Sequence, residues 1–164
     1  MSADISPLAM AFLRQAQAAA KNRIRAQKAA QEGNAEAALL FMALAEAQDV
    51  HVKKTMLFLR GRLESTADNL AETLQEAREL AVDLLEATIL AQAEGDKAGG
   101  ALLTQMAKSM VSHLALPCMP SGSRLHVYVC TICGHIHVSG AGEQGPGRCP
   151  VCQAVPEKFT EVAA

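Results

Sequence analysis

Aromatic side chains are nearly absent from this sequence. They make up 3% of its 164 residues, and none of them is tryptophan. A core that has few large rings must be lean and built mainly from Ala, Leu and Met. Before residue 117 the only large rings that can contribute to it are Phe12, Phe41 and Phe58.

Other missing features each exclude a class of protein. The net charge of −2 gives no electrostatic reason to expect nucleic acid or an anionic membrane as a partner. No run of 18 apolar residues exists, so no membrane-spanning helix is expected. The first ten residues lack a basic segment followed by an apolar one, which argues against a signal peptide and predicts a cytoplasmic location. Neither a Gly-rich phosphate loop nor a nucleophile elbow occurs.

Cysteine and proline are also missing from most of the chain. Residues 1–116 contain one proline, Pro7, and no cysteine, whereas the rest contains five prolines, five cysteines and six of the eleven glycines. Such an abrupt change of composition predicts a domain boundary. We expect a helical domain over 1–116, a linker over 117–124 and a small second domain over 125–164.

Four helices with apolar residues at spacings of three and four are predicted in the first domain. The first begins after an N-cap at Ser6, with Pro7 in its first turn, and ends before Gly33. The others are expected at about 36–60, 66–94 and 97–116. Their natural packing is an all-α four-helix bundle.

Four polar side chains interrupt the apolar stripes of these helices. Each would cost about 1–3 kcal/mol if it were buried without a partner, so they should bond one another, a water molecule or a ligand. We favour a hydrogen-bonded network in the core, because two histidines and two glutamines are a poor ligand set. The alternative is a vestigial site for one metal ion or a small ligand. The residues are Gln15, Gln48, His51 and His113.

The second domain carries two C-x-x-C pairs separated by fifteen residues. Two such turns supply a tetrahedron of sulfur ligands, which suits one Fe or Zn ion. Gly134 follows the first pair, where a chain folding under a metal often needs a positive φ, and Pro150 fixes φ in the second turn. Two disulfides are the alternative, disfavoured by the metal-like spacing. The predicted ligands are Cys130, Cys133, Cys149 and Cys152.

One cysteine and three histidines accompany this set. Cys118, in the linker, is expected to be an incidental thiol rather than a nucleophile. The three histidines surround the first pair and are expected on a solvated strand and loop, with a hydrogen-bonding role as the weaker alternative. They are His126, His135 and His137.

The whole layout resembles that of rubrerythrins, which join a ferritin-like four-helix bundle to a rubredoxin-like Fe(Cys)₄ domain. In the tail, YVCTICGH at 128–135 looks like the first metal-binding knuckle and GRCPVC at 147–152 like the second, while Phe159 closes a small core. In the bundle, AAQEG at 29–33 looks like the end of the family's first helix, and TADNL at 66–70 like the start of its third.

When the matching motifs are aligned, the resemblance implies that the family's di-iron ligands correspond to seven positions of this sequence. Both histidines are kept, but every glutamate is replaced by an amide or an apolar residue. Glu76 and Glu79 have the family's third-helix spacing one residue too early, and since one residue rotates a helical side chain by about 100° they are expected to point elsewhere. A di-iron site needs anionic oxygens, so we expect no such centre and a poor peroxidase. In helix order, the positions are Gln15; Gln48 and His51; Ala77 and Leu80; Met110 and His113.

The ion in the sulfur site then decides the function. Iron would move one electron, whereas zinc would be structural and redox-silent. Resemblance to the family favours iron, and therefore an electron-transfer protein with an unknown redox partner. The alternative is a non-catalytic interaction or scaffold protein with a structural Zn(Cys)₄ site.

The connection between the second and third helices predicts a dimer. In a ferritin-like bundle these helices run parallel, so their connection must cross the length of a helix, about 36 Å for 24 residues. Residues 61–65 can stretch at most about 18 Å. Either the helices follow simple up-down-up-down order, or the first two pack against the last two of a second chain. Resemblance to rubrerythrins favours the second solution, a homodimer that exchanges helix pairs.

Overall fold

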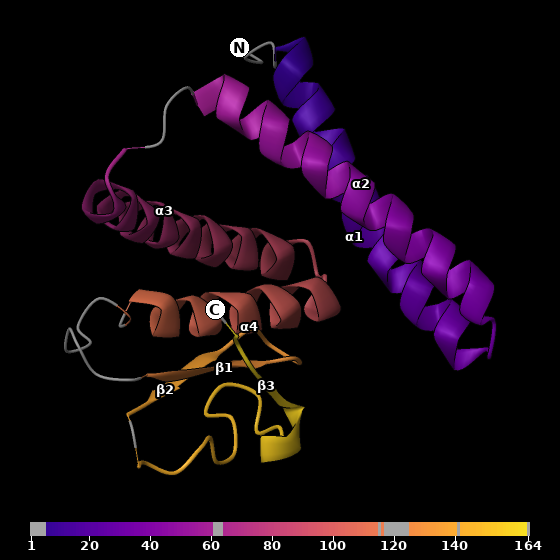
Figure 1. The fold of residues 1–164 in the computed structure, drawn as a ribbon. Helices are drawn as coiled ribbons and strands as arrows, with labels where there is room; N and C mark the ends of the chain where they lie inside the picture. Colours follow the sequence, from indigo (N-terminus) through magenta and orange to yellow (C-terminus); the bar gives the residue numbers. More distant parts are fainter. Residues whose placement is uncertain (1–5, 61–63, 115, 117–124, 141, 164) are drawn as a thin grey trace. The chain divides into compact units, whose positions relative to one another are not determined.

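The computed structural model describes residues 6–60, 64–114, 116, 125–140 and 142–163. Four helices come first in this part of the chain, and a small three-stranded sheet follows them (Figure 1). The predicted fold class is therefore confirmed. The expected linker at 117–124, including Cys118, lies outside the described residues. The chain divides into two compact units, Met1–Glu64 and Ser65–Ala164.

The first unit is a helical hairpin of α1 (Pro7–Gln31) and α2 (Ala35–Arg60). Ser6 caps α1 as predicted, because its hydroxyl accepts a hydrogen bond from the Ala9 N–H at 3.2 Å. Gly33, with φ of +75°, ends the helix, and the Asn34 N–H turns back to the Ala29 carbonyl at 2.9 Å. Small side chains make the contact between the two helices: the buried apolar residues are Ala19, Ala26, Ala29 and Ala45.

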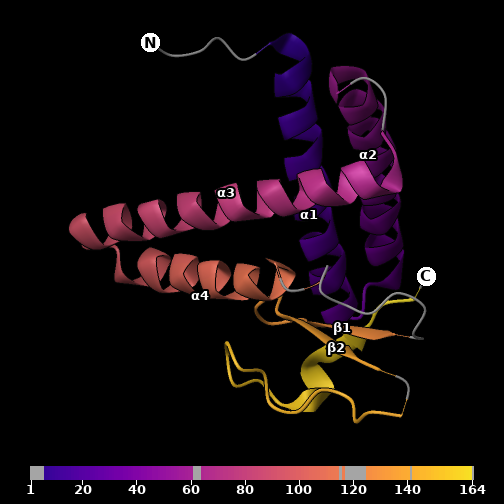
Figure 2. The same ribbon diagram turned by 90° about the vertical axis from the view of Figure 1, so that its left-hand side faces the viewer.

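The second unit begins with another hairpin, of α3 (Thr66–Ala93) and α4 (Lys97–Leu114) (Figure 2). Ser65 is the N-cap of α3 and accepts from the Asp68 N–H at 3.2 Å. Gly95, with φ of +76°, lies in the turn between the two helices. Buried residues such as Ala77, Leu84 and Ala107 lie on the two helices. Among the described residues, no helix of the chain is both long enough and apolar enough to cross a membrane.

The tail of the second unit is an antiparallel sheet in the order β2-β1-β3. Its strands are β1 (His126–Cys130), β2 (Ile136–Ser139) and β3 (Phe159–Glu161), and a short 3₁₀ helix, η2 (Pro156–Lys158), precedes β3. Tyr128 on the central strand pairs with His137 on one side and with Glu161 on the other. β2 lies against α4, so the tail and the second hairpin belong to one unit.

Candidate metal centre

Two turns of the tail have the same backbone conformation. The first follows β1, and its Gly134 N–H donates to the Cys130 carbonyl at 2.9 Å. The second precedes η2, and its Gln153 N–H donates to the Cys149 carbonyl at 2.8 Å. Gly134 has φ of +76°, as predicted, and Gln153 occupies the same left-handed region with φ of +61°. A glutamine gave no signal for this conformation, since glycine is the residue that adopts it without steric cost.

A second pair of hydrogen bonds completes the likeness of the two turns. The N–H of Cys130 donates to the His135 carbonyl, and the N–H of Cys149 donates to the Ala154 carbonyl, both at 2.9 Å. Each turn therefore presents the sulfurs of its two cysteines from one rigid loop.

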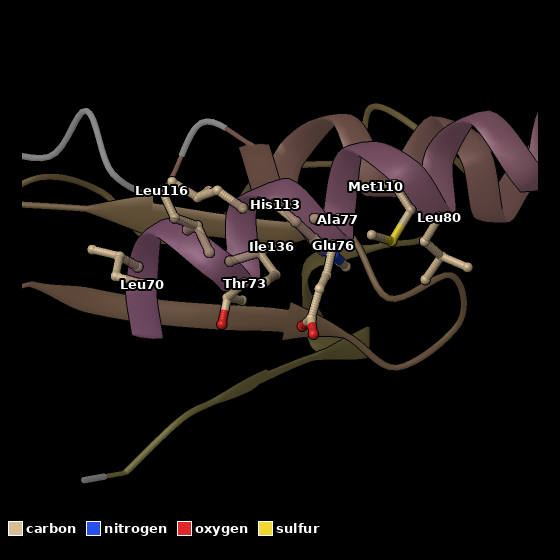
Figure 3. A pocket seen from close by; sticks show the side chains of 10 residues that line it. Leu70, Thr73, Glu76, Ala77, Leu80, Met110, His113, Leu116 and Ile136 are labelled. Atoms are coloured by element: carbon tan, nitrogen blue, oxygen red, sulfur yellow. The ribbon is translucent and has the colours of Figure 1, made fainter. Parts of the chain in front are cut away.

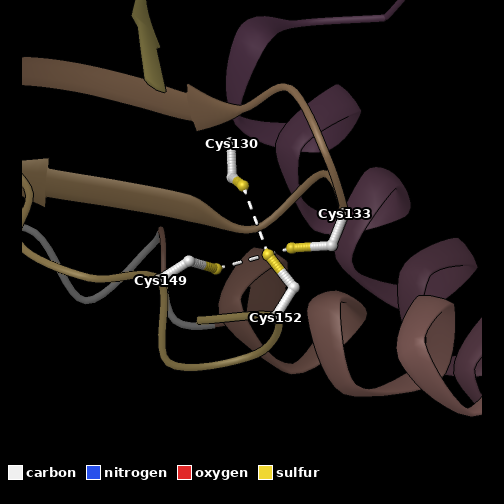
Figure 4. Close-up of side chains that lie close together, drawn as sticks. All are labelled: Cys130, Cys133, Cys149 and Cys152. Atoms are coloured by element: carbon white, nitrogen blue, oxygen red, sulfur yellow. Dashed lines mark hydrogen bonds between the residues drawn. The ribbon is translucent and has the colours of Figure 1, made fainter. Parts of the chain in front are cut away.

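The four sulfurs converge on one point (Figure 4). All of them lie within 4.8 Å of one another, with 3.7 Å between the sulfurs of Cys130 and Cys152 and 3.5 Å between those of Cys133 and Cys149. Metal–sulfur bonds of about 2.3 Å give a tetrahedron with edges of roughly 3.8 Å, close to these values. Disulfide sulfurs would be about 2.05 Å apart, and all four cysteines are free. This donor set fits one tetrahedral thiophilic ion.

Burial divides the four ligands into two kinds. Cys130 and Cys149 are only 1% and 0% exposed, whereas Cys133 and Cys152 are half-buried. Burial and the neighbouring thiols raise the pKa of Cys133, although the His135 N–H donates to its sulfur. Burial also opposes ionisation of Cys149, but the N–H groups of Cys152 and Val151, together with the thiols of Cys133 and Cys152, lower its pKa to about 7. Four adjacent thiolates need a compensating cation, which a bound metal ion supplies.

The histidines beside the first turn are less solvated than expected. His135 and His137 are half-buried, and each packs edge-on against Phe159 with ring centroids 6.4 Å apart. Within the described residues, Nδ1 of His135 and Nε2 of His137 are buried and have no hydrogen-bond partner. Burial, helped by neighbouring histidines, lowers the pKa of His135. The expectation of a solvated strand is thus wrong here, because Phe159 and these rings form the core of the tail.

The positions carried over from the family's third and fourth helices meet in one cavity of about 360 Å³ (Figure 3). Glu76 also borders this cavity but is exposed, so the expectation that it points away from the carried-over positions stays a prediction. Glu79 lies elsewhere, beside Arg78 and Asp83. The other residues around Glu76 are mostly apolar and include Ala77, Leu80, Met110, His113 and Ile136.

The carried-over positions of the first unit have another environment. Gln48 accepts a hydrogen bond from the side-chain amide of Asn22 at 3.0 Å, and Asn22 in turn accepts from Arg25 at 3.0 Å. Asn22 is 5% exposed, and sequence reasoning missed it as a partner. Asn22 lies seven residues after Gln15 and therefore on the same helix face, and this spacing could have identified it as a member of the polar network.

The remaining glutamine and the two histidines of the predicted remnant site divide between the units. His113 belongs to the second unit, where its Nε2 bonds the Gly134 carbonyl at 3.0 Å. Gln15 is half-buried and His51 is exposed in the first unit. A joint site formed by Gln15, Gln48, His51 and His113 stays a prediction.

Comparisons with known proteins agree with the resemblance seen in the sequence. Residues 128–160 match the family model described as "Rubrerythrin, rubredoxin-like domain". The comparison with curated proteins gives no match. Two solved structures of nigerythrin, one partially reduced and one fully reduced (all ferrous), share the fold with TM-scores of 0.50 and 20% sequence identity. They match 98% of this chain and 89% and 90% of their own chains. The family model confirms the resemblance to rubrerythrins over residues 128–160, and the two solved structures show that the chain shares the fold of nigerythrin.

Proposed function

We propose that this rubrerythrin-like chain transfers single electrons through one iron ion held by Cys130, Cys133, Cys149 and Cys152. The observation that carries the proposal is the convergence of four free sulfurs at separations that suit a tetrahedral ion. Iron bound by four thiolates alternates between two oxidation states and so moves one electron.

The protein contributes position and charge compensation. Two rigid turns hold the ligands, and backbone N–H groups donate to the sulfurs of Cys133, Cys149 and Cys152. Cys133 and Cys152 are half-buried, so they bring ligand sulfur close to the surface, where a redox partner protein can dock. We propose the cytoplasm as its location, and neither nucleic acid nor a membrane as a partner.

We further infer that the helical domain holds no di-iron centre and that the protein is not an active peroxidase. At the carried-over positions of α3 and α4, Ala77, Leu80 and Met110 offer no anionic oxygen. Glu76 is a single carboxylate in an otherwise mostly apolar cavity. One such group cannot bridge two cations and balance their charge.

The proposed assembly is a homodimer that exchanges helix pairs. α2 has 26 residues and is therefore about 39 Å long, which residues 61–65 cannot span. Both hairpins expose large apolar side chains: Leu39 is 71% exposed, Phe58 82%, Ile89 66% and Val111 65%. A second copy of each hairpin would cover such surface.

A metal analysis of protein purified from its native source tests the central proposal. We expect one iron per chain and the visible absorption of a ferric thiolate. One zinc per chain without colour would support instead the alternative of a scaffold protein with a structural Zn(Cys)₄ site. Absence of any metal, or two disulfides in a mass spectrum, would contradict both functions.

A further inference from the structure

The peptide group between Gly134 and His135 connects α4 to one of the four sulfurs. Its N–H donates to the sulfur of Cys133. Its carbonyl oxygen lies 3.0 Å from Nε2 of His113. A carbonyl oxygen can only accept, so His113 carries a proton on Nε2 and donates it. Two hydrogen bonds in series thus run from His113, through one peptide group, to a metal ligand.

The second turn repeats this arrangement with a different side chain. The N–H of Ala154 donates to the sulfur of Cys152. The carbonyl of the same peptide group, that of Gln153, accepts from Nη1 of Arg148 at 3.2 Å. His113 comes from a helix and Arg148 from the turn itself, yet they bind equivalent carbonyls. For each half-buried ligand, the peptide group that donates to its sulfur therefore accepts a hydrogen bond from a side-chain N–H.

We propose that His113 and Arg148 are positioning residues of the metal centre, which act on Cys133 and Cys152 through the intervening peptide groups. A donor on the carbonyl polarises the peptide group and strengthens the bond that its N–H makes to sulfur, by about 10–30% for bonds in series. Hydrogen bonds to the sulfurs of an iron–sulfur centre are among the features that set its reduction potential.

The direction of the effect follows from charge. A centre with iron and four thiolates carries one more negative charge when it is reduced, so stronger N–H···S bonds favour the reduced form. Loss of either donor should therefore lower the reduction potential. This consequence rests on the proposed iron function, whereas the two hydrogen-bond chains do not depend on which ion is bound.

A neighbouring contact makes His113 suitable for substitution. Ser112 accepts a hydrogen bond from the Ile136 N–H at 3.0 Å and donates to the Ser109 carbonyl at 2.6 Å. The tail thus keeps a bond to α4 when the imidazole is removed. Arg148 is exposed, so its replacement leaves the core of the tail unchanged.

The electrochemical test compares iron-loaded full-length variants. We expect His113→Ala and Arg148→Ala each to lower the reduced-to-oxidised ratio about threefold to tenfold at a fixed applied potential. That change corresponds to a fall of about 30–60 mV, since tenfold is 59 mV for one electron. His113→Gln keeps an N–H donor and should recover part of the loss. His126→Ala is the control, because His126 bonds Glu161 instead of a turn carbonyl. Unchanged potentials in both alanine variants would overturn the proposal.

A second test uses zinc-loaded protein and needs no redox activity. Amide hydrogen exchange measured by NMR should accelerate several-fold at His135 in His113→Ala, and at Ala154 in Arg148→Ala, with each variant leaving the other amide unchanged. If the iron protein shows no reversible reduction while this reciprocal pattern is present, the electron-transfer function fails and the positioning role stands. Equal changes at both amides, or none, would refute the positioning role itself.

Discussion

The two turns each contain one residue in the left-handed region, and substituting these residues should change the stability of the tail in opposite directions. Gly134 and Gln153 hold equivalent positions, with φ of +76° and +61°. A side chain in this region costs about 1–2 kcal/mol, and glycine avoids that cost but loses about 0.5–1 kcal/mol through its greater freedom in the unfolded chain. The difference between the two terms means that Gln153→Gly should stabilise the tail by about 0.5–1 kcal/mol and that Gly134→Ala should destabilise it by about the same amount.

Contacts around Gly134 and Gln153 hardly change these two expected changes in stability. A Cβ atom built on Gly134 would find Ser109 Oγ as its nearest neighbour at 4.0 Å, which is ordinary contact, so the cost of alanine there is conformational. Gln153 is exposed, and Arg148 bonds its backbone carbonyl, which glycine keeps. The side chain of Gln153 is thus dispensable for the turn.

Apparent metal affinity is the appropriate assay, because in so small a metal module binding free energy is largely folding free energy. Competition with a chelator should show affinity about two- to fivefold higher for Gln153→Gly and about two- to fivefold lower for Gly134→Ala, since 1.4 kcal/mol is tenfold. Gln153→Ala is the control and should stay near the wild-type value, because it keeps a Cβ at the same φ. A weaker affinity in Gln153→Gly would show that the left-handed conformation is not what limits this turn.

Four further outcomes are expected. Cys130→Ser should abolish stoichiometric metal binding in elemental analysis, and full retention of metal would contradict the ligand assignment. Removal of the metal from the wild type should unfold the tail strands in NMR spectra while the signals of α1 and α2 persist. Peroxide turnover should be negligible in the iron-loaded protein, so robust turnover dependent on iron in the helices would disprove the loss of the di-iron centre. Analytical ultracentrifugation should show a dimer that Leu44→Asp weakens, because Leu44 is 52% exposed in the single chain; a monomeric wild type would end the proposal of exchange. Asn22→Ala should lower the free energy of unfolding by about 1–3 kcal/mol in denaturant titrations, since it leaves the amide of Gln48 without its partner, and a change below about 0.5 kcal/mol would mean that water replaces Asn22.

Features encoded within a few residues could be read from the sequence. Ser6 and Ser65 start helices because a hydroxyl reaches an N–H three residues ahead, and that reach does not depend on the rest of the fold. The cysteine spacing predicted a sulfur site for the same reason, since each turn closes on its own backbone. The alanine-rich first hairpin also followed from composition, because few large rings were available for its core.

Contacts between distant segments were decided only by the tertiary structure. The sequence marked Gln48 and His113 as polar residues in apolar stripes, but their partners, Asn22 and the Gly134 carbonyl, lie 26 and 21 positions away. The left-handed glutamine at 153 is likewise imposed by the hydrogen bonds of its turn, against the preference of that residue type. Local preferences act over a few residues, whereas the partner of a buried polar group depends on which helix or strand packing brings beside it.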